Sequence, residues 1–547
     1  MTCLLFPGRH LLNTAFQAQY LRSIVQMPLA ALDFLAAPAG DLAPINQIIF
    51  AITSANQAHS RYNPIPLHVR AIGVDRFARP FEMTFGISYR IIAIPHYQPT
   101  PRFARYTLRE IQEQTEGNLT LTPANCVVLC STPAVIEQYR ALGFAILPAE
   151  LGQPGTATPN DLLQKLVAAG ENWFTDRELR QALSPATFDL WQDFPDIPRR
   201  ILRLWRDPLL NDEGSLTGDR DYASYAFGMS NNEIITVKYN DIQAAIVPGK
   251  IVDEGCGDGA LLVPIARDFP DSDLIGIEIT GEFMARAQER QRAGHFGGSY
   301  VHFHQRNITQ QIFEPNAIDT TICNSTVHEL WSYGDRQATV AAYLANKFAQ
   351  TRPGGRLIIR DVVGPPGKAQ EVAMRLNDQD GVNDDIFAEF ADPGHLAAHL
   401  AGLSTYARFQ RFARDFLAEA RATGRRGPET AIRFREARLQ GELYILLALK
   451  DAVEFMTKKD YVNNWASEMH EEFAFWDFAE WQQALRAAGF RIVADGDRPA
   501  CGSRVYSSQW IVDHRWQGKV ALFQPAGDQL LPLPYPPTNI VLVGEKS

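Results

Sequence analysis

One glycine-rich stretch, Ile251–Leu261 (IVDEGCGDGAL), constrains the fold of this chain more than any other. An apolar strand pattern ends at its aspartate, three glycines follow at alternate positions, and a helical pattern begins after them. Glycine allows the backbone to turn sharply and to approach a ligand closely, and the N-terminus of the following helix points at that ligand. The sequence therefore predicts a strand–turn–helix unit that binds a cofactor. The residues expected there are Asp253, Gly255, Cys256, Gly257 and Gly259.

Two cofactor classes fit this turn when it is taken alone. Gly255-x-Gly257-x-x-Ala260 satisfies the dinucleotide-binding fingerprint loosely. One strand–helix unit later, Glu278 ends a second apolar run and can accept hydrogen bonds from a ribose diol. An acid at that position suits NAD as well as any other cofactor that contains adenosine.

The segments that follow resemble class I S-adenosylmethionine-dependent methyltransferases. They are Phe303–Ile308, Ala317–Ser325 and Arg352–Asp361, the last with a Pro-Gly-Gly turn. The resemblance implies S-adenosylmethionine as cofactor. It also implies that Asn307 and Ile308 lie beside the adenine and that Asn324 stands at the ligand-facing end of the fourth strand.

Candidate catalytic groups follow this fourth strand directly. The resemblance places His328 and Glu329 near the methyl group that would be transferred. Methyl transfer is an in-line displacement that needs a closely aligned acceptor and often a base, and an unperturbed histidine has a suitable pKa. His470 and Glu471 are further candidates. The alternative for His328 is a structural residue that is hydrogen-bonded beneath the loop.

Composition limits the remaining choices. A chain of 547 residues predicts two or three domains. A net charge of −10 disfavours a generally basic nucleic-acid binder. The six scattered cysteines are expected to be buried reduced thiols, and no metal site is expected. No apolar run suits a membrane span and no signal-peptide pattern begins the chain, so the expected location is cytoplasmic.

Residues 1–190 alternate strand and helix patterns and are expected to form a separate α/β domain with a parallel sheet. The order of these pieces resembles the nucleotidylyltransferase superfamily, nearest to nicotinamide-nucleotide adenylyltransferase-like proteins. The resemblance implies a site for ATP or another nucleotide. The positions concerned are Gly8, Arg9, His10, Thr14, Gln17 and Arg70.

This front domain departs from its family at the phosphate-binding motif. Where the family has a second histidine, this chain has Gln17, a neutral amide that stabilises developing charge less well. Two interpretations stay open. Either Arg9, His10 and Arg70 have taken over the phosphates, or the domain is a non-catalytic sensor or interaction module.

The whole chain is expected to be α/β, with two doubly wound Rossmann-like domains, the second a seven-stranded methyltransferase sheet carrying a helical insert. Residues 191–235 are expected to form a linker and lead-in helix. The helical pattern runs from Tyr222 to Tyr239, and its Tyr225, Met229 and Tyr239 either line a lid or only pack. Residues 236–367 would form the cofactor-binding core, 368–480 the helical acceptor-binding insert, and 481–547 the C-terminal strands.

The expected reaction is methylation of a small molecule, in one version a nucleotide-linked one presented by the front domain. The alternative is an RNA methyltransferase that grips phosphates with the front domain and with the arginine-rich run Arg408–Arg438. A solvated helix face with internal ion pairs is the other explanation of that run. A membrane partner is not expected.

Overall fold

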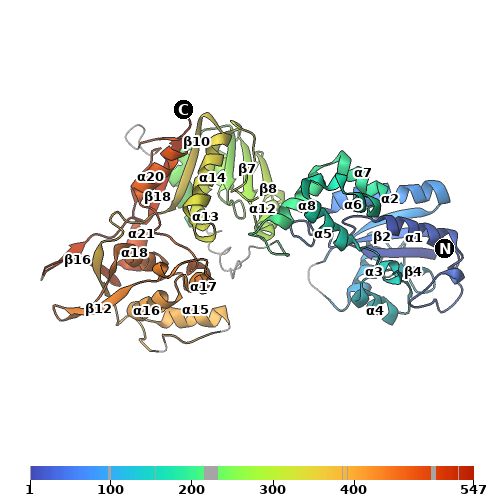
Figure 1. Cartoon of the computed structure of the whole chain (residues 1–547), viewed down its shortest axis with the longest axis horizontal. Helices are drawn as coiled ribbons and strands as arrows, with labels where there is room; N and C mark the ends of the chain where they lie inside the picture. Colours follow the sequence, from blue (N-terminus) through green and yellow to red (C-terminus); the bar gives the residue numbers. More distant parts are fainter. Residues whose placement is uncertain are drawn as a thin grey trace. The chain divides into compact units, whose positions relative to one another are not determined.

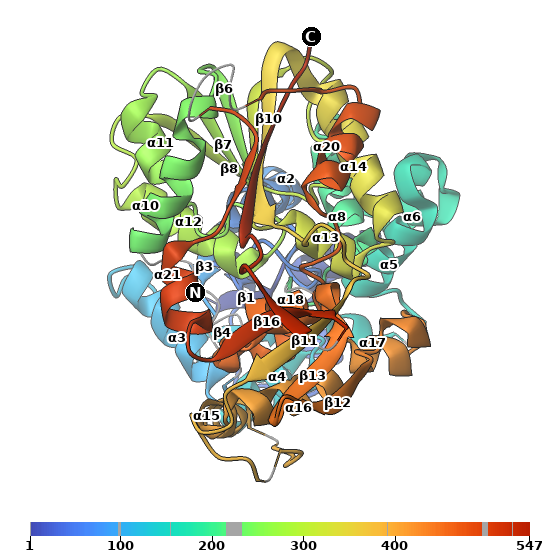
Figure 2. The same ribbon diagram turned by 90° about the vertical axis from the view of Figure 1, so that its left-hand side faces the viewer.

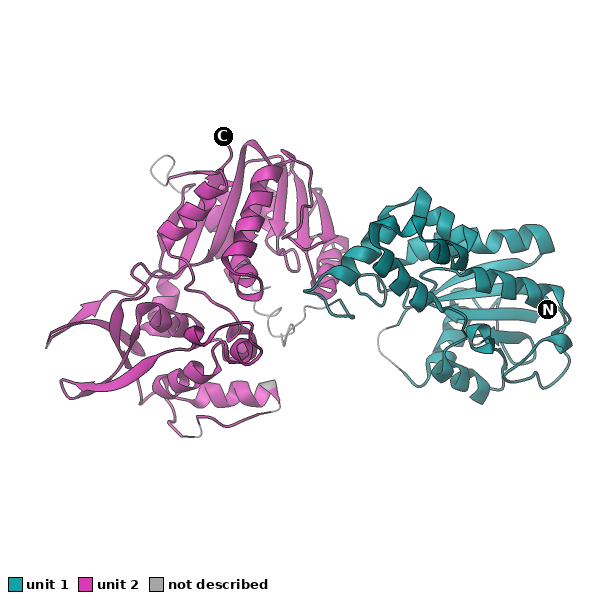
Figure 3. Cartoon of the chain, in the orientation of Figure 1, with its two compact units in different colours: residues 1–217 teal, residues 218–547 magenta. Residues whose placement is uncertain are grey.

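The computed structural model describes residues 2–96, 100–153, 155–214, 232–384, 386–390, 392–494, 501–527 and 529–547. The chain divides into two compact units, residues 1–217 and 218–547, coloured separately in Figure 3. The first unit thus extends beyond the expected boundary at residue 190, because helices α7 and α8 belong to it.

The first unit is a doubly wound α/β domain. Its sheet has the order β3-β2-β1-β4-β5, and all four pairings are parallel. The strands are β1 (Thr2–Gly8), β2 (Ile45–Thr53), β3 (Ser88–Ile94), β4 (Cys126–Leu129) and β5 (Ala145–Leu147). The helices are α1 (Ala15–Gln26), α2 (Leu67–Phe85), α3 (Phe103–Gln114), α4 (Pro133–Ala141), α5 (Pro159–Ala169), α6 (Arg177–Ala182), α7 (Pro185–Asp193) and α8 (Asp196–Arg206). The predicted parallel sheet is therefore confirmed for this unit.

The second unit contains the expected seven-stranded sheet, in the order β14-β18-β10-β9-β6-β7-β8, with a short additional strand β15 paired to β18. Its strands are β6 (Lys250–Glu254), β7 (Asp273–Glu278), β8 (Tyr300–Gln305), β9 (Ile318–Asn324), β10 (Thr351–Val362), β14 (Arg491–Ile492), β15 (Arg504–Tyr506) and β18 (Asn539–Glu545). Strands β6 to β10 run parallel, and β18 runs antiparallel to β10. The parallel strands consequently end along one edge, where ligands bind in open α/β sheets.

Helices cover both faces of this sheet (Figures 1 and 2). One apolar cluster joins the sheet to α10 (Asn232–Ile242) and α11 (Leu262–Asp268), and a second joins it to α14 (Gln337–Gln350) and α20 (Phe478–Ala487). The remaining core helices are α12 (Gly281–Arg292) and α13 (Val327–Tyr333). Of the lead-in segment, α10 carries Tyr239, which is buried, while Tyr225 and Met229 lie outside the described residues.

The insert contains the expected helices, but it also contains a sheet that the sequence did not predict. It is built on a five-stranded antiparallel sheet in the order β12-β13-β11-β16-β17. The strands are β11 (Glu371–Leu376), β12 (Phe434–Leu439), β13 (Glu442–Ala448), β16 (Val520–Ala526) and β17 (Gln529–Leu533). Its helices are α15 (Pro393–Gly402), α16 (Thr405–Asp415), α17 (Ala418–Ala422), α18 (Leu449–Lys458), α19 (Trp465–Glu468) and α21 (Gln509–Ile511). Strands β16 and β17, expected in the core sheet, belong to this insert.

All six cysteines are buried free thiols, as predicted. Among the described residues, none of the helices combines the length and the apolar character that crossing a membrane requires.

Candidate functional site

The glycine-rich turn joins β6 to α11 at the carboxyl edge of the core sheet. Gly255, Gly257 and Gly259 have φ values of 71°, 53° and 76°, a region that side chains rarely tolerate. A Cβ at Gly255 would lie 2.5 Å from Oγ1 of Thr326, and one at Gly259 would lie 2.9 Å from the ring of Phe303. All three glycines are therefore required by backbone conformation, and Gly255 and Gly259 are required by close packing as well.

Asp253 is a buried carboxylate with an unsatisfied oxygen. Only 2 % of the residue is exposed, and no group of the described protein bonds to its Oδ2. Burial raises the pKa of Asp253 to about 7, opposed by the charge of Lys238 and supported by those of Glu254 and Glu278. A buried unsatisfied acceptor is costly, so this atom suits a ligand that brings a donor, above all a cationic one.

Glu278 ends β7 next to the glycine-rich turn. Its Oε2 accepts the backbone N–H of Gly257 at 3.0 Å. Its Oε1 accepts the N–H groups of Ile279 and Thr280 at 2.8 and 2.9 Å. Burial raises the pKa of Glu278, while these hydrogen bonds oppose the rise. The structure thus places Glu278 against the turn, as a cofactor contact at this position would require.

The other expected cofactor residues lie along the same edge. Asn307 is buried, and its Oδ1 accepts the N–H and the hydroxyl of Thr309 at 3.0 and 2.8 Å. Ile308 belongs to the apolar core, Asn324 ends β9, and burial raises the pKa of the Cys256 thiol well above its usual value.

His328 lies in the first turn of α13 and is held by two carboxylates. Its Nδ1 is 2.6 Å from Oδ1 of Asp361, and its Nε2 is 3.3 Å from Oε2 of Glu471. Burial by itself lowers the pKa of His328, but the charge of Asp361 and the hydrogen bonds with both acids raise it well above its usual value. The ring is therefore a doubly donating imidazolium, which matches the structural alternative for this residue better than a free base.

The remaining catalytic candidates lie on different elements. Glu329 is half-buried on α13, and its charge acts on Glu278 and on Lys238 of α10. His470 lies outside this group of interactions, since its Nε2 is 2.9 Å from Oε2 of Glu419 on α17.

Two residues of this edge were missed by the sequence analysis. Asp361 ends β10 and accepts the backbone N–H groups of Val327 and His328 at 2.8 and 3.2 Å, so it caps α13. Lys238 is half-buried on α10 and is attracted by Asp253, Asp361 and Glu329. The position of Asp361 at the end of an apolar strand was a usable signal, whereas no local pattern marks Lys238.

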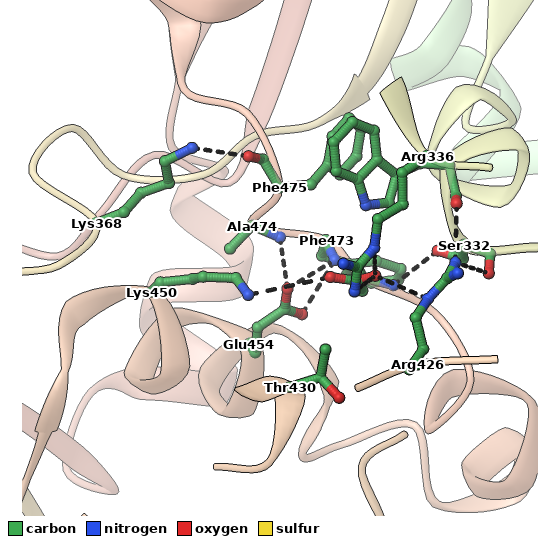
Figure 4. A network of polar contacts seen from close by, with 12 residues as sticks. Ser332, Arg336, Lys368, Arg426, Thr430, Lys450, Glu454, Phe473, Ala474 and Phe475 are labelled. Carbon is green, nitrogen blue, oxygen red and sulfur yellow. Dashed lines mark hydrogen bonds and ion pairs between the residues drawn. The ribbon is translucent and has the colours of Figure 1, made fainter. Parts of the chain in front are cut away.

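A charge network joins the insert to the core around Arg336, Arg426 and Glu454 (Figure 4). It lies beside His328, whose ring contacts that of Phe473. Glu472 pairs with Arg336 of the core at 2.9 Å and with Arg426 of the insert at 3.7 Å. Two residues along, the N–H of Ala474 donates to Glu454 of α18 at 2.8 Å. The segment that carries Glu471 is thereby fixed from both sides.

In the front unit, the expected phosphate-binding residues are engaged with the protein itself. Thr14 and Gln17 form a capping box at the start of α1, and Nε2 of Gln17 donates to Glu150 at 2.7 Å. The guanidinium of Arg70 donates to the carbonyl oxygens of Arg9, Thr53, Ser54 and Gln57 at 2.8–3.3 Å.

The loop after β1 is equally occupied. His10 is buried with its Nε2 3.0 Å from the carbonyl oxygen of Phe6, and burial lowers its pKa to about 4. Arg9 donates to the carbonyl oxygen of Tyr62 at 2.6 Å, and Gly8 faces the ring of His10. The nucleotide site stays a prediction. To bind a phosphate, these side chains would have to break their present hydrogen bonds with the protein.

The arginine-rich run of the insert is divided between inner and outer positions. Five of its arginines are buried or half-buried, and four are exposed: Arg425, Arg433, Arg435 and Arg438. Arg408 donates to the carbonyl oxygen of Leu400 and to Asp460. Arg411 pairs with Asp415 at 2.5 Å, and Arg426 donates to the carbonyl oxygen of Ser332 at 2.8 Å. These arginines support the fold of the insert and do not form a row of phosphate contacts.

A family model described as a methyltransferase domain matches residues 248–402. Among solved structures, an S-adenosylmethionine-dependent methyltransferase from Clostridium acetobutylicum matches at 10 % identity and a TM-score of 0.29, over 60 % of this chain and 99 % of that one. A SAM-dependent methyltransferase from Methanosarcina mazei matches at 13 % identity and a TM-score of 0.28, over 56 % of this chain and 95 % of that one. No curated protein matches the sequence.

Proposed function

We propose that the chain is a class I S-adenosylmethionine-dependent methyltransferase. The family match over residues 248–402 supports the reaction class. The observation that carries the cofactor is the acidic edge of the core sheet, where Asp253, Glu278 and Glu329 gather around the glycine-rich turn. A cofactor with a sulfonium and an ammonium group fits an acidic edge.

The same edge disfavours the dinucleotide alternative. Dinucleotide sites direct glycine-loop amides and a helix N-terminus at a pyrophosphate, but here the N–H of Gly257 already donates to the carboxylate of Glu278. A pyrophosphate beside Glu278 and Asp253 would meet negative charge at low dielectric constant. Electrostatics therefore favour S-adenosylmethionine over NAD.

Asp253, Glu278, Asn307 and the glycine-rich turn would hold this cofactor, with Ile308 and Asn324 completing the edge. The bound cofactor supplies an electrophilic methyl group. Glu329, half-buried on α13 beside Lys238 and Glu278, is the candidate base. His328 supports the reaction by fixing the insert through Glu471, since its ring donates to two carboxylates.

A small molecule is the proposed methyl acceptor. The insert joins the core at His328 and Glu471, next to the edge where the cofactor would lie, so it is the part of the chain best placed to select an acceptor. An RNA acceptor is not favoured, because Arg408 and Arg411, which were expected to grip phosphate, bond instead to a carbonyl group and an acid of the insert.

For the front unit we propose a non-catalytic binding or interaction role. Nucleotidyl transfer needs cationic groups that face the phosphates, and Arg70 and His10 are buried with protein partners.

Calorimetric titration of S-adenosylmethionine, NAD and ATP separately into the full chain tests these assignments. We expect S-adenosylmethionine to bind, with affinity lost in Asp253→Ala and kept in Asp273→Ala, an exposed acid at the opposite end of β7. Binding of NAD without S-adenosylmethionine would overturn the methyltransferase assignment, and tight ATP binding would restore a nucleotide site in the front unit.

A further inference from the structure

Lys238 lies on a helix that is fixed to the core on both sides. The hydroxyl of Tyr239 donates to Asp268 of α11 at 2.7 Å. One turn after Lys238, Asp241 accepts Nε of Arg360 of β10 at 2.7 Å. Residues three apart share a face of a helix, so Lys238 lies on the face of α10 that meets the carboxyl end of β10.

The ammonium group of Lys238 belongs to the acidic edge of the sheet. It is attracted by Asp253 of β6, Asp361 of β10 and Glu329 of α13, and it is repelled by Arg360. Burial and the charge of Arg360 lower the pKa of Lys238 to about 8. Among the described residues, no group donates a hydrogen bond to Oδ2 of Asp253.

Two other cations described at this edge, Arg360 and His328, are already bound to protein groups. Arg360 donates to Asp241 and to the hydroxyl of Tyr506. His328 bridges Asp361 and Glu471. Lys238 interacts with the acids around it through space, and its four-carbon side chain can move to a new partner. A ligand carboxylate that enters this edge therefore finds Lys238 more available than Arg360 or His328.

We propose that Lys238 binds the carboxylate of the amino-acid end of S-adenosylmethionine, while Asp253 binds the neighbouring ammonium. This inference rests on the proposed function. An amino-acid zwitterion placed between the two residues would satisfy the free oxygen of Asp253 and the charge of Lys238 together. The assignment also gives a reason for the presence of Lys238 among the acids of this edge.

The test compares two probes that differ in this amino-acid end. S-adenosylhomocysteine carries it, and methylthioadenosine lacks it. Each is titrated by calorimetry into the full chain and into Lys238→Gln, Lys238→Arg and Lys250→Gln. Lys250 is the matched control because it lies at the amino end of β6, away from the site. Melting temperatures of the variants confirm that each is folded.

We expect Lys238→Gln to lower the affinity for S-adenosylhomocysteine roughly 10- to 100-fold, which is the range for loss of a hydrogen bond between charged groups. Its affinity for methylthioadenosine should be unchanged, and Lys238→Arg and Lys250→Gln should resemble the wild type. Equal weakening of both probes, unchanged binding or tighter binding of S-adenosylhomocysteine would overturn the role of Lys238 alone. A wild-type chain that binds neither probe would overturn the proposed function as well.

Discussion

Nδ1 of His328 lies 2.6 Å from Oδ1 of Asp361, and this contact ties the helix after β9 to the end of β10. The opposite nitrogen of the ring reaches Glu471, which belongs to the insert. The buried side chain of His328 therefore links the carboxyl ends of β9 and β10 to the insert segment that carries Glu471. Because both ring nitrogens face carboxylates, the imidazolium form is favoured and a lone pair is not offered to a substrate.

The first prediction concerns the stability that His328 confers. Removing one partner of a buried ion pair typically costs 3–5 kcal/mol, so we expect His328→Gln to lower the free energy of unfolding of the second unit by about 3 kcal/mol at pH 6. The pKa of His328 is raised on folding, so this contribution is fully present below its unfolded pKa. It is lost as the pH rises through the folded pKa.

Urea unfolding at pH 6 and at pH 10 measures this effect, with His302→Gln on the exposed side of β8 as control. The difference in the free energy of unfolding between the wild type and His328→Gln should be smaller at pH 10 than at pH 6. A gap that is constant with pH would mean that His328 acts by packing against Phe473 and not through its charge.

The second prediction separates stability from binding at Asp253. Burial raises the pKa of Asp253 to about 7. Between its unfolded pKa and pH 7, the carboxyl group ionises more readily in the unfolded chain than in the folded one, so the free energy of unfolding falls as the pH rises. Asp253→Asn should therefore raise the melting temperature at pH 8, by about 3 °C, and have little effect at pH 4. The same substitution should lower the affinity for S-adenosylhomocysteine roughly tenfold or more, as expected for loss of a hydrogen bond between charged groups. Unchanged affinity would remove Asp253 from the site.

The third prediction is the pH dependence of S-adenosylhomocysteine binding. Affinity should rise as Asp253 ionises through about pH 7 and fall as Lys238 loses its proton above about pH 8. Burial is the largest cause of both pKa shifts, and Asp253 and Lys238 also act on each other. The further charges are Glu254 and Glu278 around Asp253, and Arg360, Asp361 and Glu329 around Lys238. Calorimetry from pH 6 to pH 9.5 measures the profile.

The Lys238→Arg variant identifies the group behind the alkaline limb of that profile. Arginine stays charged throughout this range, so the fall in affinity should shift to higher pH. A limb that does not move in this variant would belong to the amino group of the ligand or to another residue.

The positions of Asp253, Glu278 and the glycine-rich turn at one edge of the core sheet could be predicted from the sequence because their signals are local. Asp253 and Glu278 each end an apolar run, and the glycines at alternate positions adopt the positive φ values that such a turn requires. The α/β class and the parallel sheets follow from the same alternation of strand and helix patterns.

The insert sheet and Lys238 could not be predicted in this way, because both depend on contacts between distant segments. Ala373 of β11 pairs with Leu446 on one side and Phe523 on the other. Strand β12, FREARL, is a largely polar edge strand without an apolar run. Lys238 acquires its surroundings only when α10 packs against β10, so its sequence neighbours carry no sign of the site.

The last prediction concerns Arg70, expected to face phosphates and found beneath the loops of the front unit. It is 1 % exposed and donates to four backbone carbonyl groups. Arg70→Met leaves these buried acceptors without donors, which should lower the free energy of unfolding of this unit by about 3 kcal/mol.

Thermal melting with and without ATP measures both possible roles of Arg70, with Arg22→Met on the exposed face of α1 as control. A structural arginine gives a lower melting temperature in Arg70→Met and no shift by ATP in either the wild type or the variant. If ATP stabilises the wild type and Arg70→Met abolishes that shift while remaining folded, the guanidinium leaves its carbonyl partners to bind phosphate. The front unit would then be a nucleotide-binding domain, because only a ligand with greater affinity for the cation could displace four hydrogen bonds.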